Sequence, residues 1–159
     1  VFLMWPSDQR QLQAIAQWAN VLFQSIGIKT DYASMDWGTL VGRRVSRKPV
    51  AEGGWDSFAT TWSGLPVSNP GSSFPLRGNG FGGWFGWPVD DEMEKLRDAW
   101  FDAPDLAAQQ KICRDIQTLA FEHVPFFPTG HWTTPTAFRK NITGVVDTPS
   151  PVFWNVRKG

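Results

Sequence analysis

The chain has 159 residues and a mass of 17.9 kDa, enough for one domain of ordinary size with a hydrophobic core. Lysine plus arginine and aspartate plus glutamate each total 15, and this zero net charge argues against a protein that binds nucleic acid. No apolar run approaches the roughly 18 residues that a membrane span needs. Cys113 is the only cysteine, which excludes an intrachain disulfide and a cysteine-based zinc site.

The first 33 residues predict a strand, a helix and a second strand. Residues 1–5 are apolar, Ser7 is placed to cap a helix, and apolar residues then recur every three or four positions up to Gly27. Gly27 is suited to a left-handed helix end, and residues 28–33 alternate as a strand does. This βαβ pattern predicts parallel pairing. Because the chain starts directly in a strand, without a leader sequence, we expect it to come from a longer polypeptide.

A shorter helix is predicted at residues 36–45, capped by Asp36. Arg43 and Arg44 near its end suit the helix dipole, which we favour over an anion-binding role for these cations. Residues 55–62 predict a third strand.

Residues 63–88 differ from the rest of the chain: they contain seven Gly and four Pro and no Asp or Glu. We predict a long irregular loop that serves binding, because a disordered linker would lack its aromatic residues. Beyond it, residues 90–103 and 104–124 predict two helices that form a hairpin, with a core stripe on the second that ends at His123. Residues 126–132 and 134–138 predict strands, followed by a turn-rich end.

Signatures of catalysis are weak. His123 and His131 lack a metal-ligand context, and the glycine pattern at 78–83 follows a loop, unlike a dinucleotide-binding motif. The acidic residues at 90–94 are explained by a helix start, and Cys113 lies on the core stripe. We therefore expect no catalytic residue, no metal site and no cofactor.

The combination of aromatic rings with glycine suggests recognition instead. Trp and Phe rings offer apolar faces to a ligand, and glycine lets the backbone come close to it. Some of these rings are expected to pack in the core or against another domain.

The order of several motifs resembles the C-terminal part of family 5 extracellular solute-binding proteins, the dipeptide, oligopeptide and nickel class that serves ABC importers. Each motif is loose alone, but their order and spacing cover nearly the whole chain. They are Ile26-Gly27-Ile28-Lys29-Thr30, Gly54-Trp55-Asp56 leading to Trp62, Val89-Asp90-Asp91-Glu92-Met93, Gln109-Gln110-Lys111, Glu122-His123-Val124-Pro125 and Phe138-Arg139-Lys140-Asn141-Ile142-Thr143-Gly144-Val145.

This resemblance implies an α/β protein with a mixed sheet flanked by helices, one lobe of a type II periplasmic binding protein-like fold. Residues 1–159 would be a C-terminal lobe fragment whose N-terminal lobe is missing. The whole protein would lie in the periplasm, or be lipid-anchored outside the cytoplasmic membrane. It would enclose a small molecule or peptide between its lobes and deliver it to an ABC transporter permease.

One position departs from the family. Peptide-binding members commonly carry an aspartate three residues after the tryptophan equivalent to Trp62, where it pairs with the amino terminus of the peptide. Leu65 stands at that position here, so the ligand class stays open among peptides, oligosaccharides and other small solutes. The predicted ligand-binding residues are Trp62, Ser63, Leu65, Asn79, Phe81, Gly83 and Trp84.

Two alternatives use the same aromatic residues. A self-contained carbohydrate-binding or carbohydrate-cleaving domain would use them as sugar platforms, although a hydrolase needs two carboxylates that the loop lacks. A protein-interaction domain would use them against a partner chain.

Overall fold

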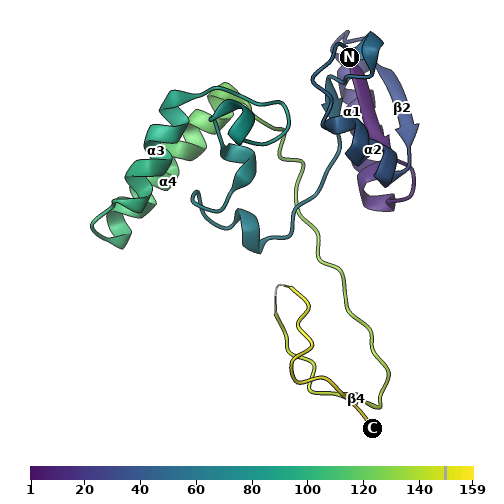
Figure 1. Ribbon diagram of the computed structural model, residues 1–159, viewed down its shortest axis with the longest axis vertical. Helices are drawn as coiled ribbons and strands as arrows, with labels where there is room; N and C mark the ends of the chain where they lie inside the picture. The colour runs from purple at the N-terminus through teal and green to yellow at the C-terminus, as the bar shows by residue number, and fades with distance from the viewer. Residues whose placement is uncertain (149) are drawn as a thin grey trace. The chain divides into compact units, whose positions relative to one another are not determined.

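The computed structural model describes residues 1–148 and 150–159, and the chain divides into two compact units, residues 1–61 and 62–159 (Figure 1). The predicted α/β class is confirmed, since the chain contains four α-helices and two small sheets among its described residues. The assignment of residues 1–159 to one lobe stays a prediction.

The first unit is built around the strand β1, Phe2–Pro6. It lies between β2, Asp31–Met35, and β3, Ser57–Phe58, and is parallel to both. The parallel pairing predicted for the βαβ unit is confirmed. The sheet of this unit is not mixed, because its three strands all run the same way.

Two helices accompany this sheet: α1, Arg10–Ser25, and α2, Trp37–Arg44. Trp5 of β1 packs with Leu12 and Ala16 of α1 in one buried cluster. Alternation along the strand turns Met4, which has no exposed surface, to the other face of the sheet. Leu40 of α2 is equally buried.

Two of the three helix-end predictions for this unit are confirmed. Gly27 has a φ of +83°, the left-handed conformation predicted for it, and Asp36 caps α2 by accepting a hydrogen bond from the Thr39 amide. The prediction that Ser7 caps α1 is wrong. Its hydroxyl instead donates to the Met35 carbonyl at 3.2 Å and joins two neighbouring strand ends.

The second unit contains the helix hairpin formed by α3, Asp91–Phe101, and α4, Leu106–His123. Met93 packs against Ile116 and Leu119 in a buried cluster, which confirms the predicted hairpin and most of the core stripe. The prediction that the stripe extends to His123 is wrong, because that side chain is exposed. Asp90 caps α3 through the Met93 amide, as the acidic helix start predicts.

Three strand predictions are wrong in part or in whole. The strand predicted at 55–62 is reduced to Ser57–Phe58, because its pairing with β1 is confined to Leu3 and Met4. Residues 126–132 and 134–138 are exposed and irregular. Pro128 and Pro135 each remove a backbone donor from this segment, which disfavours a ladder.

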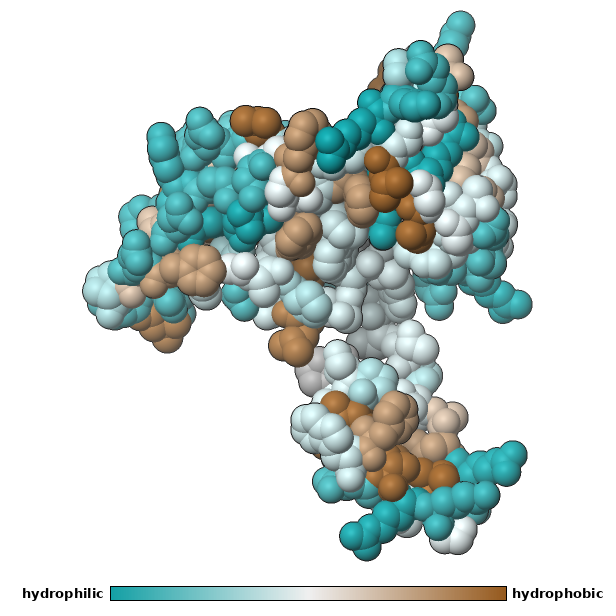
Figure 2. Space-filling model, viewed as in Figure 1, coloured by the Kyte–Doolittle hydropathy of each residue, from teal (hydrophilic) through white to brown (hydrophobic). Residues whose placement is uncertain are grey.

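The end of the second unit holds an antiparallel pair, β4, Ile142–Thr143, and β5, Arg157–Lys158. Figure 2 shows apolar side chains at the surface of this C-terminal segment. They include Val145, Val146 and Phe153, of which Phe153 is 76% exposed.

Candidate functional site

The glycine-rich segment ahead of α3 is an irregular loop, as predicted, but an ordered one. It contains three short 3₁₀ turns: η2, Leu65–Val67, η3, Phe74–Leu76, and η4, Gly80–Gly82. Pro66 and Pro75 lie in the first turns of η2 and η3, where an amide hydrogen is not needed. The prolines and glycines therefore define turns and do not loosen the segment.

Two backbone hydrogen bonds join the ends of the segment 78–90 and close this part of the loop into a turn. The Gly80 amide donates to the Pro88 carbonyl at 2.9 Å, and the Asp90 amide donates to the Gly78 carbonyl at 2.8 Å. Within this closed turn Trp87 has a φ of 49°, a left-handed conformation that is strained for a bulky side chain. Its amide donates to the Trp84 carbonyl at 2.9 Å, which helps to hold that conformation.

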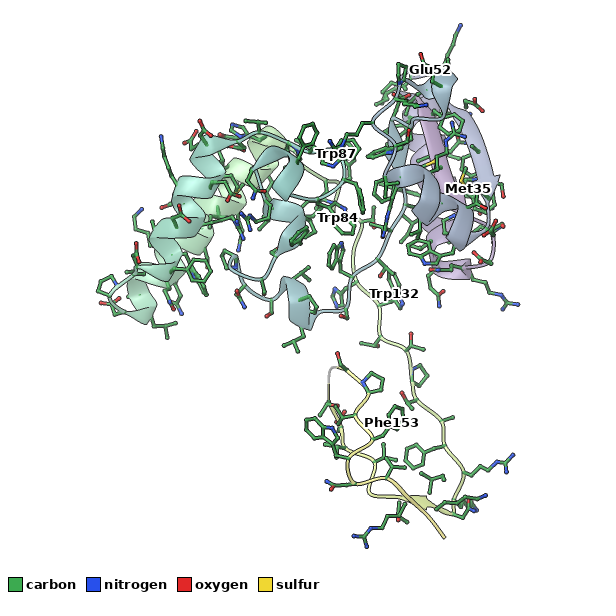
Figure 3. The ribbon with its side chains drawn as sticks, in the orientation of Figure 1. Met35, Glu52, Trp84, Trp87, Trp132 and Phe153 are labelled. Atoms are coloured by element: carbon green, nitrogen blue, oxygen red, sulfur yellow. The ribbon has the colours of Figure 1, made fainter. Side chains whose placement is uncertain are left out.

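Six aromatic side chains of this loop contact one another, and we call them the aromatic cluster. At its centre the ring centroids of Trp62 and Trp84 are 4.6 Å apart, and Trp84 also contacts Phe85 at 4.7 Å. Trp84 and Trp87 project from the loop in Figure 3. The members are Trp62, Phe74, Phe81, Trp84, Phe85 and Trp87.

The structure brings together two of the predicted ligand-binding residues, Trp62 and Trp84. Phe81 contacts Trp87 at a centroid distance of 6.2 Å, Trp87 in turn contacts Phe85, and Phe81 is 70% exposed. Phe74, Phe85 and Trp87 complete the cluster but were not among the predicted site residues. Their place in the loop was visible in the sequence, whereas their mutual contacts depend on the turns.

The remaining predicted residues surround the cluster without joining its rings. The Asn79 side chain lies close to the turn that follows it, since a Cβ atom on Gly83 would come within 3.0 Å of Asn79 Oδ1. Gly83 therefore permits a close approach of the backbone to this amide. Ser63 and Leu65 are exposed and lie directly after Trp62.

A partly buried ion-pair network attaches the loop to α3, and the sequence did not reveal it. Glu94 of α3 accepts hydrogen bonds from Arg77 Nε at 3.2 Å, from the Gly78 amide at 2.8 Å and from Arg97 Nη1 at 3.0 Å. Burial acts to raise the pKa of Glu94, but the Gly78 amide and the two arginines outweigh it and hold the pKa below its ordinary value. Glu94 is therefore a charged acceptor and not only an acidic residue at a helix start.

Arg97 extends the network to an earlier part of the loop. Its side chain is 5% exposed, and it donates to the carbonyls of Pro70 at 3.0 Å and of Gly71 at 3.3 Å. Burial lowers the pKa of Arg97, while Glu94 acts to raise it. The spacing of Glu94 and Arg97, three residues apart on one helix, was the signal available in the sequence.

A second feature adjoins the base of the loop. His123, at the end of α4, places Nδ1 at 2.7 Å from Oδ2 of Asp90. The two side chains line an open pocket that also includes acidic residues at the start of α3. The lining residues are Pro88, Val89, Asp90, Asp91, Glu92, His123 and Pro125.

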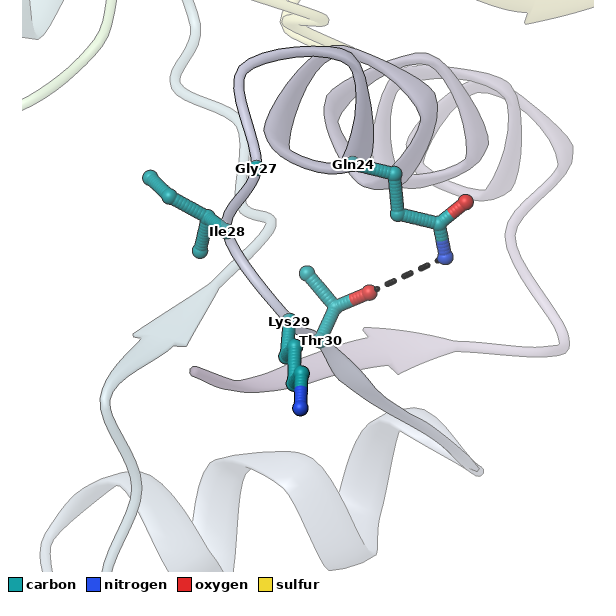
Figure 4. A pocket seen from close by; sticks show the side chains of 5 residues that line it. All are labelled: Gln24, Gly27, Ile28, Lys29 and Thr30. Atoms are coloured by element: carbon teal, nitrogen blue, oxygen red, sulfur yellow. Dashed lines mark hydrogen bonds between the residues drawn. The ribbon is translucent and has the colours of Figure 1, made fainter.

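The first unit has a pocket of its own, beside the turn that ends α1 (Figure 4). Gln24 Nε2 donates to Thr30 Oγ1 at 3.3 Å, and Lys29 is the only charged residue of its lining. None of the predicted site residues lies in this pocket.

Among residues 1–148 and 150–159, no group of three or more His, Cys, Asp or Glu side chains could hold a metal ion. In the same residues, no helix is long and apolar enough to cross a membrane.

No family model matches the chain. A curated protein of Sinorhizobium fredii, named as a probable peptide ABC transporter periplasmic-binding protein, is 34% identical to it over 154 residues. The match covers 97% of this chain but only 28% of that relative, which is consistent with a partial C-terminal piece. The resemblance predicted from the motifs is thereby confirmed: the chain is similar, over nearly all of its length, to part of a protein that is named as a peptide ABC transporter periplasmic-binding protein.

Proposed function

We propose that the chain is part of a solute-binding protein that encloses a small solute between two lobes and delivers it to an ABC transporter permease. The aromatic cluster on its closed loop is the observation that carries this proposal. The relationship to a protein named as a peptide-binding transporter component supports it. The chain would supply one lobe of type II fold, and the N-terminal lobe would complete the binding cleft.

The solute is proposed to bind through the rings at the centre of the cluster. Trp62 and Trp84 are half-buried, so each retains a face for a ligand while its neighbours hold it in place. Phe81, Ser63 and Leu65 would add exposed contacts, and Asn79 and Gly83 would add polar and backbone contacts. Binding without catalysis is expected, since the relative is named as a binding component.

The ligand class we favour is a peptide whose contact with the loop is uncharged. Arg77 is the only charged residue between Trp62 and Pro88, and it is already paired with Glu94. No carboxylate of this segment can meet a free ammonium group. A capped or internal peptide segment with an aromatic or aliphatic side chain fits such a surface best.

The location and partners follow from the same relationship. The protein would act in the periplasm or anchored outside the cytoplasmic membrane, with a permease as its partner and no role in nucleic-acid binding. Recovery of the native protein from the periplasmic fraction, with a cytoplasmic marker absent from that fraction, would support this location.

The binding proposal is tested by calorimetry on the full-length protein. The probes are the tripeptide Ala-Phe-Ala, its N-acetylated and C-amidated form, and cellobiose as a carbohydrate. Trp62→Ala and Trp84→Ala should each weaken peptide binding by about tenfold or more, because each removes a large contact surface. Trp18→Ala is the matched control, since Trp18 is 57% exposed on α1 and lies outside the cluster.

Each alternative predicts a different outcome. Binding of cellobiose without binding of either peptide would favour a carbohydrate module. A dimer that survives dilution and is lost in Trp84→Ala or Trp87→Ala would favour a protein-interaction domain. Unchanged peptide affinity in both Trp62→Ala and Trp84→Ala would exclude the aromatic cluster as the recognition surface.

A further inference from the structure

The network around Glu94 connects α3 to both halves of the loop that carries the aromatic cluster. Through Arg97 it reaches the carbonyls of Pro70 and Gly71, ahead of η3. The carboxylate of Glu94 itself accepts hydrogen bonds from Arg77 and from the amide of Gly78, just before the closed turn. The stretch from 70 to 78, which includes Phe74 of the cluster, is thus attached to one helix at both ends.

Close packing of the loop on α3 accompanies these hydrogen bonds. A Cβ atom on Gly71 would lie 2.6 Å from the ring of Phe101, so the backbone there touches the helix directly. A Cβ atom on Gly78 would lie 2.6 Å from the Asp90 carbonyl oxygen. At both glycines the loop backbone therefore lies too close to α3 or its cap for a larger residue to fit without a shift.

We propose that Glu94 is a positioning residue for ligand binding, acting through the loop and not by contact with the ligand. This inference rests on the proposed function of the aromatic cluster. The carboxylate fixes the backbone at Gly78, from which the closed turn with Trp84 begins. It also holds Arg97 in the geometry that fixes Pro70 and Gly71. Side chains that bind a ligand are effective when a second layer of contacts holds them in place.

The test uses Glu94→Gln in the full-length protein. Glutamine keeps the shape of the side chain but removes the negative charge that interacts with two arginines and a backbone amide. We expect faster backbone amide exchange across residues 70–89 and unchanged exchange across α4. Affinity for the tripeptide probe that the unmutated protein binds most tightly should fall by about tenfold. Glu122→Gln, the same change at an exposed position of α4, should alter neither quantity.

Arg97→Lys is the second variant, in case Glu94→Gln does not fold. Lysine keeps the positive charge but lacks the planar guanidinium, so it cannot donate to two carbonyls and a carboxylate at once. We therefore expect the same faster amide exchange and the same loss of affinity. A residue that only stabilises the fold would lower the melting temperature without changing the affinity of the folded protein. That readout separates positioning from stability.

The outcomes distinguish this proposal from the one on which it rests. If Trp84→Ala weakens binding but Glu94→Gln and Arg97→Lys leave exchange and affinity unchanged, positioning by Glu94 is overturned and the proposed function stands. Loosening of residues 70–89 without loss of affinity also overturns it. If the unmutated protein binds none of the peptide probes, the proposed function is overturned and this inference with it.

Discussion

His123 Nδ1 and Asp90 Oδ2 lie 2.7 Å apart and join the end of α4 to the start of α3. The same aspartate accepts a hydrogen bond from the Met93 amide at 3.0 Å, so one carboxylate both caps a helix and binds the histidine. Its own amide closes the base of the aromatic loop through the Gly78 carbonyl. Three parts of the second unit therefore meet at Asp90.

The first prediction concerns the pH dependence of this pair. The hydrogen bond to Asp90 raises the pKa of His123, and nearby Glu92 and Glu122 act in the same direction. Burial acts to raise the pKa of Asp90, but hydrogen bonds from His123 and the Met93 amide hold it below its ordinary value. The raised histidine pKa stabilises the fold fully below the ordinary histidine value and loses this effect as pH rises through the folded value. The aspartate contribution is lost as pH falls through its lowered value.

Urea unfolding of the unmutated protein and His123→Ala across a pH series checks this prediction. The stability difference should be largest at about pH 5–6, between the two titrations, and should shrink toward about pH 8. His131→Ala, a change at an exposed histidine, serves as the control. A difference between the unmutated protein and His123→Ala that grows above pH 7 would contradict the assignment.

A second prediction tests the close approach at the base of the loop. Gly78→Ala would place a Cβ atom 2.6 Å from both the Cβ and the carbonyl oxygen of Asp90, so the structure must shift. The free energy of unfolding should fall by about 1–3 kcal/mol. Gly64→Ala is the control, because Gly64 has helical backbone angles and open space around its Cβ position. Chemical denaturation measures both, and equal effects would mean that sterics at Gly78 do not matter.

A third prediction uses two leucines of α4. Leu119 is 6% exposed and packs against Met93, whereas Leu106 is 67% exposed at the start of the same helix. Leu119→Ala should lower the free energy of unfolding of the second unit by about 2–5 kcal/mol, because it leaves a cavity. Leu106→Ala should change it by less than about 0.5 kcal/mol. Similar losses in both variants would place the core of the hairpin elsewhere.

A fourth prediction concerns Leu65 and the affinity for a peptide with a charged amino terminus. The family resemblance places an aspartate there in peptide-binding members, and the side chain is 57% exposed in this structure. Leu65→Asp should therefore increase affinity for Ala-Phe-Ala with a free amino terminus by about tenfold, since a charge-assisted partner becomes available. Its affinity for the N-acetylated peptide should not rise. Leu65→Asn separates the effect of charge from that of polarity, and calorimetry that finds equal gains for both peptides would refute the role of the carboxylate.

The regular elements were predictable because their signals are local. The cap at Asp36, the left-handed glycine at Gly27 and the hairpin of α3 and α4 each depend on residues within a few positions of one another. Ser7 failed as a cap because its hydroxyl found an acceptor at Met35, which is far away in the sequence. The strands expected at 126–132 and 134–138 failed because short apolar runs do not specify a partner strand, and Pro128 and Pro135 remove backbone donors.

The candidate site, like the fold, was only partly predictable from the sequence. The family resemblance pointed to Trp62 and the composition of the loop pointed to Trp84, and the structure places these rings in contact. The role of Glu94 was hidden, because an acidic residue in the first turn of a helix is already accounted for by the dipole. Its partners Arg77 and Gly78 become visible only when the loop is folded back on α3.

The closed base between Asn79 and Val89 has a consequence for the thermodynamics of recognition. Ordering a loop costs conformational entropy, and a ligand that must order it loses that amount from its affinity. Here the ends of the turn are already joined, so folding itself bears the entropic cost of bringing them together. A solute meeting these rings would retain more of its contact energy, and its binding would show a smaller entropic penalty than binding to an open glycine-rich segment.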